Sequence, residues 1–172
     1  LMYQPTSEDT IAGVTRISMC CKEIAQGVFL IDTGAGGIPG RVACYLVKGE
    51  KAALVDAGHA TSAGTVISSL QSIDGARPQV DYLIPTHVHL DHAGAVGHLA
   101  RAMPTAQVLV DERGAKHVID PARLIQHQER YWGQQSLSVF GTPIGVPRDR
   151  VTPVVGPHQV ELGSGKRLTL LR

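Results

Sequence analysis

One short run, His-Val-His-Leu-Asp-His at positions 87–92, constrains this chain more than any other feature. It directly follows an apolar, strand-like segment. Side chains two residues apart on an extended chain point the same way, so His87 and His89 can address one point as the strand ends. Asp91 and His92 follow where the chain must turn, and they can face that point from another side. Imidazole and carboxylate groups together favour a metal ion that can activate water.

Two other stretches accompany this run. Residues 53–58, Ala-Leu-Val-Asp-Ala-Gly, predict a strand that ends in Asp56, and the interval to His87 leaves room for one helix and one strand. Together with residues 111–121, these features resemble the metallo-β-lactamase-fold hydrolases, including members such as glyoxalase II and the lactonases. The resemblance implies a layered α/β domain, the four-layer αββα sandwich of that superfamily.

The resemblance also implies a ligand set. His87 and His89 would bind one metal ion, and Asp91 and His92 would belong to a second. Zinc is the expected metal, up to two ions, with iron or manganese as alternatives. Asp91 would orient the attacking water or accept its proton, and it is the best general-base candidate if one metal is bound. Asp56 would support the ligand loop by accepting hydrogen bonds; the other interpretation is an ordinary turn-capping aspartate.

The chain departs from the family pattern as well. The Pro-Gly-His loop, the later bridging aspartate and the last histidine ligand do not occur in these 172 residues. Residues 24–172 therefore correspond to the first half of the sandwich and part of the second, after a weakly structured lead-in over residues 1–23. We expect weak metal binding and little catalysis from residues 1–172 alone. We also expect an open strand edge that favours homo-oligomers or a complementing C-terminal segment.

Three functions are compatible with these residues. The first is a metal-dependent hydrolase that acts on a small ester, thioester, lactone or related substrate through a metal-activated water. The second is a di-iron oxidoreductase of the same fold, because histidine and carboxylate ligands suit iron as well as zinc. The third is a catalytically incomplete fragment that serves as a binding or assembly module. Metal content separates the third function from the other two.

Composition limits the class of protein, its partners and its cellular compartment. A hydrophobic content of 43% in 172 residues is enough for one domain with a core. The net charge of +1 gives no reason to expect a nucleic acid or a membrane surface as a partner. Of the three cysteines, Cys20 and Cys21 are adjacent and Cys44 lies in an apolar run, which fits no disulfide framework. We therefore expect reduced thiols and a cytoplasmic protein.

Strands and helices are expected to alternate through most of the chain. The expected strands are 27–32, 42–47, 52–56, 82–85, 107–110, 151–155, 159–162 and 167–171, of which the second and third form an antiparallel hairpin. The expected helices are 61–72, 91–102 and a mostly helical stretch over 113–140, followed by a loop over 141–148.

The remaining histidines carry weaker signals. His59 could line a pocket or lie in a solvated loop, and the sequence favours neither. The other four match no ligand spacing, so we interpret them as structural or surface residues, although one of them could sit on a lid beside Tyr131 and Trp132. These four are His98, His117, His127 and His158.

Overall fold

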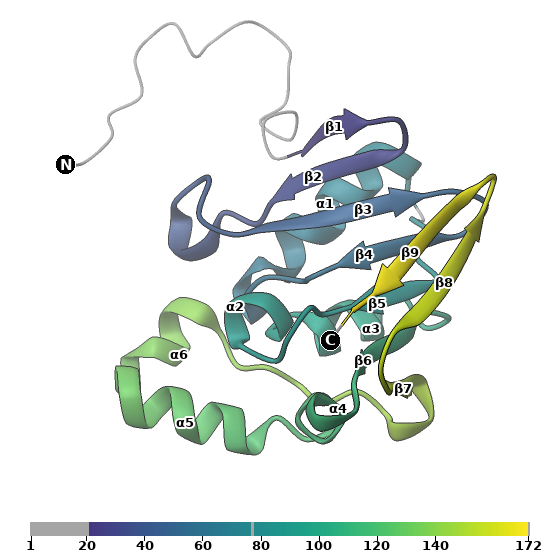
Figure 1. Cartoon of the computed structure of the whole chain (residues 1–172). Helices are drawn as coiled ribbons and strands as arrows, with labels where there is room; N and C mark the ends of the chain where they lie inside the picture. The colour runs from purple at the N-terminus through teal and green to yellow at the C-terminus, as the bar shows by residue number, and fades with distance from the viewer. Residues whose placement is uncertain (1–20, 77, 172) are drawn as a thin grey trace, which may run out of the picture.

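The computed structural model describes residues 21–76 and 78–171, in which a large sheet separates a layer of helices from a β-hairpin (Figure 1). Seven strands form this sheet in chain order. They are β1 (Cys21–Ala25), β2 (Val28–Asp32), β3 (Ala43–Lys48), β4 (Ala52–Val55), β5 (Tyr82–Ile84), β6 (Gln107–Asp111) and β7 (Val151–Val154). Neighbours from β1 to β4 are antiparallel, and neighbours from β4 to β7 are parallel.

One face of the sheet carries the main core. The helices α1 (Ala63–Asp74) and α3 (Val96–Ala102) bury residues such as Leu70 and Leu99 against sheet residues such as Leu54. The periodicity of both segments explains this, since residues three and four apart share one helix face. Cys44 lies in this core as the sequence predicts, and burial raises the pKa of its thiol far above the ordinary range.

The opposite face is covered in part by a hairpin of β8 (His158–Gly163) and β9 (Lys166–Leu170), which crosses the sheet in Figure 1. Val160 and Leu162 form a second core with sheet residues such as Ile84 and Leu109. The described residues thus form a helical layer, a seven-stranded sheet and a two-stranded hairpin on the other face of that sheet. The layered α/β class predicted from the sequence is confirmed.

The predicted helix 91–102 is two helices, α2 (Leu90–Ala93) and α3. At the break, the backbone N–H of Ala95 donates to the carbonyl of Gly58 at 2.9 Å. A Cβ on Gly94 would clash with the carbonyl oxygen of Leu90 and lie 3.0 Å from the backbone nitrogen of Ala60, so a glycine is needed there. Contact with the loop after β4 therefore ends the first helix and positions both against that loop.

The helical stretch predicted over 113–140 is three short helices, α4 (Glu112–Ile119), α5 (Ala122–Trp132) and α6 (Gln135–Phe140). Residues 120–121, Asp-Pro, and Gly133, with φ of 77°, interrupt it. The described residues also contain three 3₁₀ turns, at Ala35–Gly37, Ala60–Ser62 and Arg148–Arg150. None of the described helices is long and apolar enough to cross a membrane.

Residues 21–23, the described part of the expected lead-in, differ from the prediction. β1 begins at Cys21, inside the stretch expected as a lead-in over residues 1–23, because Cys21 pairs with Ile31 of β2. Cys20 lies outside the described residues.

Candidate metal centre

The predicted ligand run lies where two parallel strands end. β4 and β5 pair in register, Val55 with Ile84, so the segments that follow them leave the same edge of the sheet. Asp56 follows β4 directly, and the His-rich run follows β5. The carboxyl ends of parallel strands are where open α/β sheets bind their ligands. The backbone N–H of Ala57 donates to the carbonyl of His92 at 2.8 Å, which ties the two segments together.

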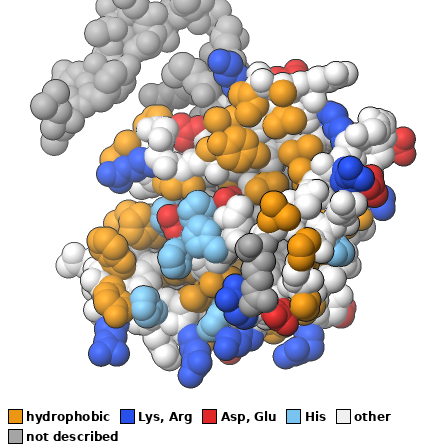
Figure 2. Space-filling model, in the orientation of Figure 1, with side chains coloured by type: hydrophobic (Ala, Val, Ile, Leu, Met, Phe, Trp, Pro, Cys, Tyr) orange, Lys and Arg blue, Asp and Glu red, His pale blue; other side chains and the backbone are white. Residues whose placement is uncertain are grey.

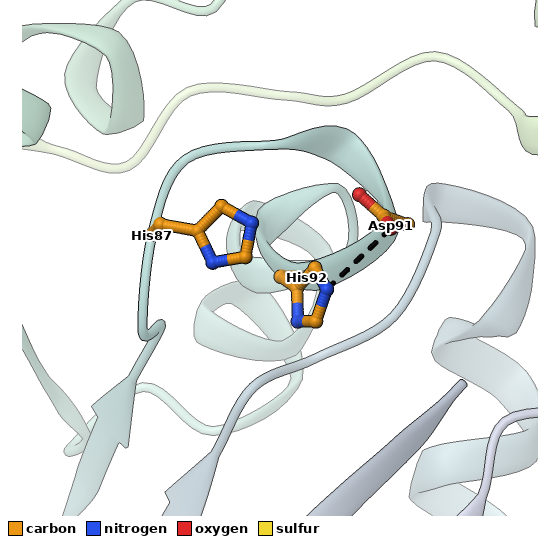
Figure 3. Close-up of side chains that lie close together, drawn as sticks. All are labelled: His87, Asp91 and His92. Carbon is orange, nitrogen blue, oxygen red and sulfur yellow. Dashed lines mark ion pairs between the residues drawn. The ribbon is translucent and has the colours of Figure 1, made fainter.

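Three of the predicted ligands meet at one point (Figure 3). One potential ligand atom from each of His87, Asp91 and His92 lies within 4.8 Å of the other two. His92 Nε2 is 3.4 Å from Asp91 Oδ2, and the rings of His87 and His92 have centroids 4.2 Å apart. His87 is exposed and the other two are half-buried. Catalytic zinc sites use three protein donors and leave one coordination position open for water, so this cluster has the number of donors that such a site needs.

Asp56 lies directly behind this cluster. It is 8% exposed and has φ of 60°, a left-handed conformation that aspartate tolerates better than most residues. Its Oδ1 accepts from the backbone N–H of Thr86 at 2.8 Å and from the Thr86 hydroxyl at 2.9 Å. Its Oδ2 is 2.9 Å from His92 Nδ1. Asp56 therefore contacts both a loop amide and a histidine of the cluster.

These bonds define which nitrogens are available to a metal. Because Asp56 Oδ2 is an acceptor, His92 carries its proton on Nδ1 and presents the lone pair of Nε2. The Thr86 hydroxyl gives its proton to Asp56, so its oxygen accepts from His87 Nδ1, 3.0 Å away. His87 then also presents Nε2. A carboxylate that fixes the tautomer of metal-binding histidines is common in metal sites, and these donors fit a divalent cation.

The surroundings of His87 favour its neutral form. Partial desolvation of the ring lowers its pKa below the ordinary 6.5, and the neighbouring His92 and His89 lower it further, whereas Asp56 and Asp91 act in the opposite direction. A metal ligand must be deprotonated, so this shift reduces competition from protons near neutral pH.

His89 lies beside the cluster rather than within it. The ring of His89 contacts the ring of His87 edge to face, with centroids 4.7 Å apart. His89 is the residue immediately before α2. The structure therefore brings His87, Asp91 and His92 together with Asp56 behind them, whereas a shared metal for His87 and His89 stays a prediction.

A cavity of about 640 Å³ opens beside the cluster. Figure 2 shows pale-blue histidine side chains in the middle of this face, next to hydrophobic side chains from the helical region. His89 and Asp91 form part of its wall, and so do His59, Arg41 and Phe140. The sequence analysis missed the last two. A loop arginine and a helix-end phenylalanine carry no local signal of a pocket.

The remaining histidines lie apart from the three-residue cluster. His98 Nε2 is 3.0 Å from the carbonyl oxygen of Thr142, a contact that links α3 to the loop after α6. His127 lines the cavity and its ring is 4.4 Å from that of Tyr131. His117 lies on α4, and His158 is exposed on β8.

Comparison with known proteins relates this chain to one family. The family model described as the metallo-beta-lactamase superfamily matches residues 37–171. The metallo-beta-lactamase fold-containing protein ST1585 of the archaeon Sulfurisphaera tokodaii is 27% identical over 150 residues, which are 85% of this chain and 54% of that protein. The rubredoxin-oxygen oxidoreductase of Megalodesulfovibrio gigas is 32% identical over 106 residues, which are 57% of this chain and 26% of that protein.

Solved structures of related proteins have the same fold. The crystal structure of ST1585 superimposes with a TM-score of 0.68 at 28% identity, and the match covers 82% of this chain and 53% of that one. A subclass B3 metallo-beta-lactamase from a soil metagenome has a TM-score of 0.58 at 20% identity, over 80% of this chain and 47% of that one, which shows likeness of fold alone. The chain spans about half the length of the archaeal relative. With the family model matching most of its residues, this chain belongs to the metallo-beta-lactamase superfamily.

Proposed function

We propose that this chain carries the metal-binding part of a hydrolase that cleaves a small ester, thioester, lactone or related substrate with a metal-activated water. One observation supports this most directly: His87, Asp91 and His92 offer ligand atoms within 4.8 Å at the edge of a cavity. The hydrogen bonds of Asp56 orient the two histidines for a cation.

Each residue has a distinct part in this proposal. A divalent cation held by His87, Asp91 and His92 would supply a water whose pKa is lowered toward roughly 7. Zinc suits this donor set, with iron or manganese as alternatives, and His89 would contribute if a second ion binds. Asp91, whose side chain is 44% exposed and lines the cavity, is placed to accept the proton of that water. Asp56 orients the histidines from the side away from the cavity.

Metal analysis with an activity panel tests this function. The protein is purified without added metal, its metal content is measured by mass spectrometry, and hydrolysis of an aryl ester, a thioester and a lactone is followed before and after chelation. Because the sequence predicts weak metal binding, we expect slow hydrolysis that a chelator abolishes, zinc restores, and His87→Ala removes. Hydrolysis that survives chelation would contradict the proposal.

A second candidate function is a di-iron oxidoreductase. The 32% identity with a rubredoxin-oxygen oxidoreductase over 106 residues favours it, because histidine and carboxylate ligands also suit iron. Iron as the metal retained after purification, with oxygen consumption in the presence of a reductant and no hydrolysis, would select this function over the first.

A further inference from the structure

His59 is a buried histidine that the metal centre does not use. It is 8% exposed, and its ring stacks on that of Phe140 with centroids 4.3 Å apart and an interplanar angle of 19°. Its Nδ1 is shielded from solvent and has no hydrogen-bond partner among the described residues. Burial lowers the pKa of His59, so the ring is neutral at neutral pH. A buried, unpaired polar atom is unusual and requires an explanation.

The Nδ1 atom itself is closed to solvent, but the His59 ring borders a cavity. The ring forms part of the wall of the 640 Å³ cavity, which also contains His89 and Asp91 from the metal-centre run. That volume is within the usual range for small-molecule sites, about 300–1,000 Å³. His59 is therefore a neutral hydrogen-bonding group at the side of a ligand-sized cavity, close to the reacting centre.

The rest of the cavity has two chemical characters. Leu124 and Trp132 of α5 and Phe140 at the end of α6 form an apolar wall. Hydrophobic side chains gather there in Figure 2. Such a wall favours an alkyl or aryl group, because burying apolar surface is favourable by about 25 cal/mol per Å².

Arg41 supplies the opposite character. Among the described residues that line the cavity, it carries the one fixed positive charge, and it makes no salt bridge with any described residue. A Cβ placed on Gly36 would lie 3.9 Å from both Arg41 Nη1 and Val139 Cγ1, so the guanidinium lies near α6. An unpaired guanidinium at a cavity mouth is suited to a carboxylate, which it can bind with two parallel hydrogen bonds.

We infer that this cavity binds a small amphipathic carboxylate. Its alkyl or aryl part lies against Trp132 and Phe140, its anionic group pairs with Arg41, and a polar group near the metal centre hydrogen-bonds to His59. The inference rests on the proposed hydrolase for its biological setting, because it names the class of substrate: an ester, thioester or lactone that carries a carboxylate apart from the bond to be cleaved.

Binding can be measured without metal or turnover. Trp132 is the chain's one tryptophan, so its fluorescence reports directly on this wall. The chelator-treated chain is titrated at pH 8 with octanoate and with octanamide, a neutral probe of the same length. We expect octanoate to bind about fivefold more tightly, the effect of one partly exposed ion pair. Arg41→Gln should abolish that preference, whereas Arg101→Gln, an exposed arginine on α3, should preserve it.

A separate experiment tests the part of His59 in binding. His59→Phe keeps an aromatic ring against Phe140 and removes both nitrogens. It should weaken the binding of 8-hydroxyoctanoate, which has a second polar group for this ring, about fivefold, the effect of one net hydrogen bond. It should leave the binding of octanoate unchanged, because the single polar group of octanoate pairs with Arg41. Circular dichroism confirms that each variant is folded, and His59→Asn repeats the test with a smaller polar side chain that should recover part of the affinity for 8-hydroxyoctanoate. Equal binding of octanoate and octanamide, a preference that survives Arg41→Gln, equal weakening of octanoate and 8-hydroxyoctanoate by His59→Phe, or no binding at all would overturn the inference. An intact preference in a chain that hydrolyses nothing would instead count against the hydrolase alone.

Discussion

The exchange of Asp56 for asparagine separates the orientation of the ligands from the stability of the fold. Asp56 accepts three hydrogen bonds, two from Thr86 at Oδ1 and one from His92 Nδ1 at Oδ2. Asparagine keeps the Oδ1 acceptor and tolerates the φ of 60°, so the Thr86 bonds persist. At the other position it presents an NH₂ group, which donates to His92 Nδ1 and forces the imidazole proton onto Nε2. The nitrogen that faces Asp91 then has no lone pair for a metal.

The two consequences have different sizes. Replacing the charge-assisted hydrogen bond between Asp56 and His92 with a neutral one should lower the free energy of unfolding of the metal-free chain by about 1 kcal/mol. Loss of a carboxylate that orients a metal-binding histidine typically weakens metal binding about 10–100-fold. Urea unfolding of the metal-free chain measures the first quantity, and zinc titration against a chromophoric chelator measures the second.

Asp81→Asn is the matched control. The carboxylate of Asp81 accepts the backbone N–H of Ala52 at 2.8 Å, at the opposite end of β4 from Asp56. We expect a similar loss of stability and unchanged zinc affinity. Unchanged zinc affinity in Asp56→Asn itself would refute the account of how the histidines are oriented.

Three further predictions concern catalysis, pH and association. Asp91→Asn should reduce kcat of the metal-loaded protein at least about 100-fold with little change in KM, as expected for general-base catalysis; a change confined to KM would mean that Asp91 only binds substrate. Burial lowers the pKa of His59 from the ordinary 6.5, so the unfolded chain binds more protons than the folded chain near that pH. The free energy of unfolding should therefore fall as the pH drops through about 6.5. His59→Phe should flatten this dependence in urea unfolding between about pH 7.5 and 5.5, and an unchanged slope would refute the argument. In the described residues β9 pairs only with β8, and its Leu170 is half-buried beside an open groove of about 330 Å³. The isolated chain should therefore self-associate, which light scattering should detect, and Leu170→Lys should shift the chain toward monomers. A monodisperse monomer before substitution would contradict the proposal.

The parts of the site that are local in sequence could be predicted from it. His87, Asp91 and His92 lie within six residues, and the strand–turn context alone brings their side chains to one edge of the sheet. Asp56 could be predicted because a strand-end carboxylate next to such a run requires donors, and Thr86 supplies two of them. In both cases the information lies in short-range geometry.

The cavity could not be predicted in this way. Its wall depends on how α5 and α6 fold back against the loop after β4, which is a tertiary contact between Phe140 and His59. The periodicity of 113–140 indicates helices but not where a glycine or proline divides them. The split of the predicted helix 91–102 depends in part on the same kind of contact, because a Cβ on Gly94 would meet the backbone of Ala60 as well as the carbonyl oxygen of Leu90.

Zinc titration of the metal-free chain tests the central claim most directly. The account predicts saturable zinc binding that is lost in His87→Ala and preserved in His98→Ala, since His98 bonds to the Thr142 carbonyl rather than to the cluster. Metal content after dialysis, measured by mass spectrometry, should follow the same order. Equal zinc binding by His87→Ala and the unchanged chain, or equal loss in both variants, would show that the metal centre is not formed by His87, Asp91 and His92.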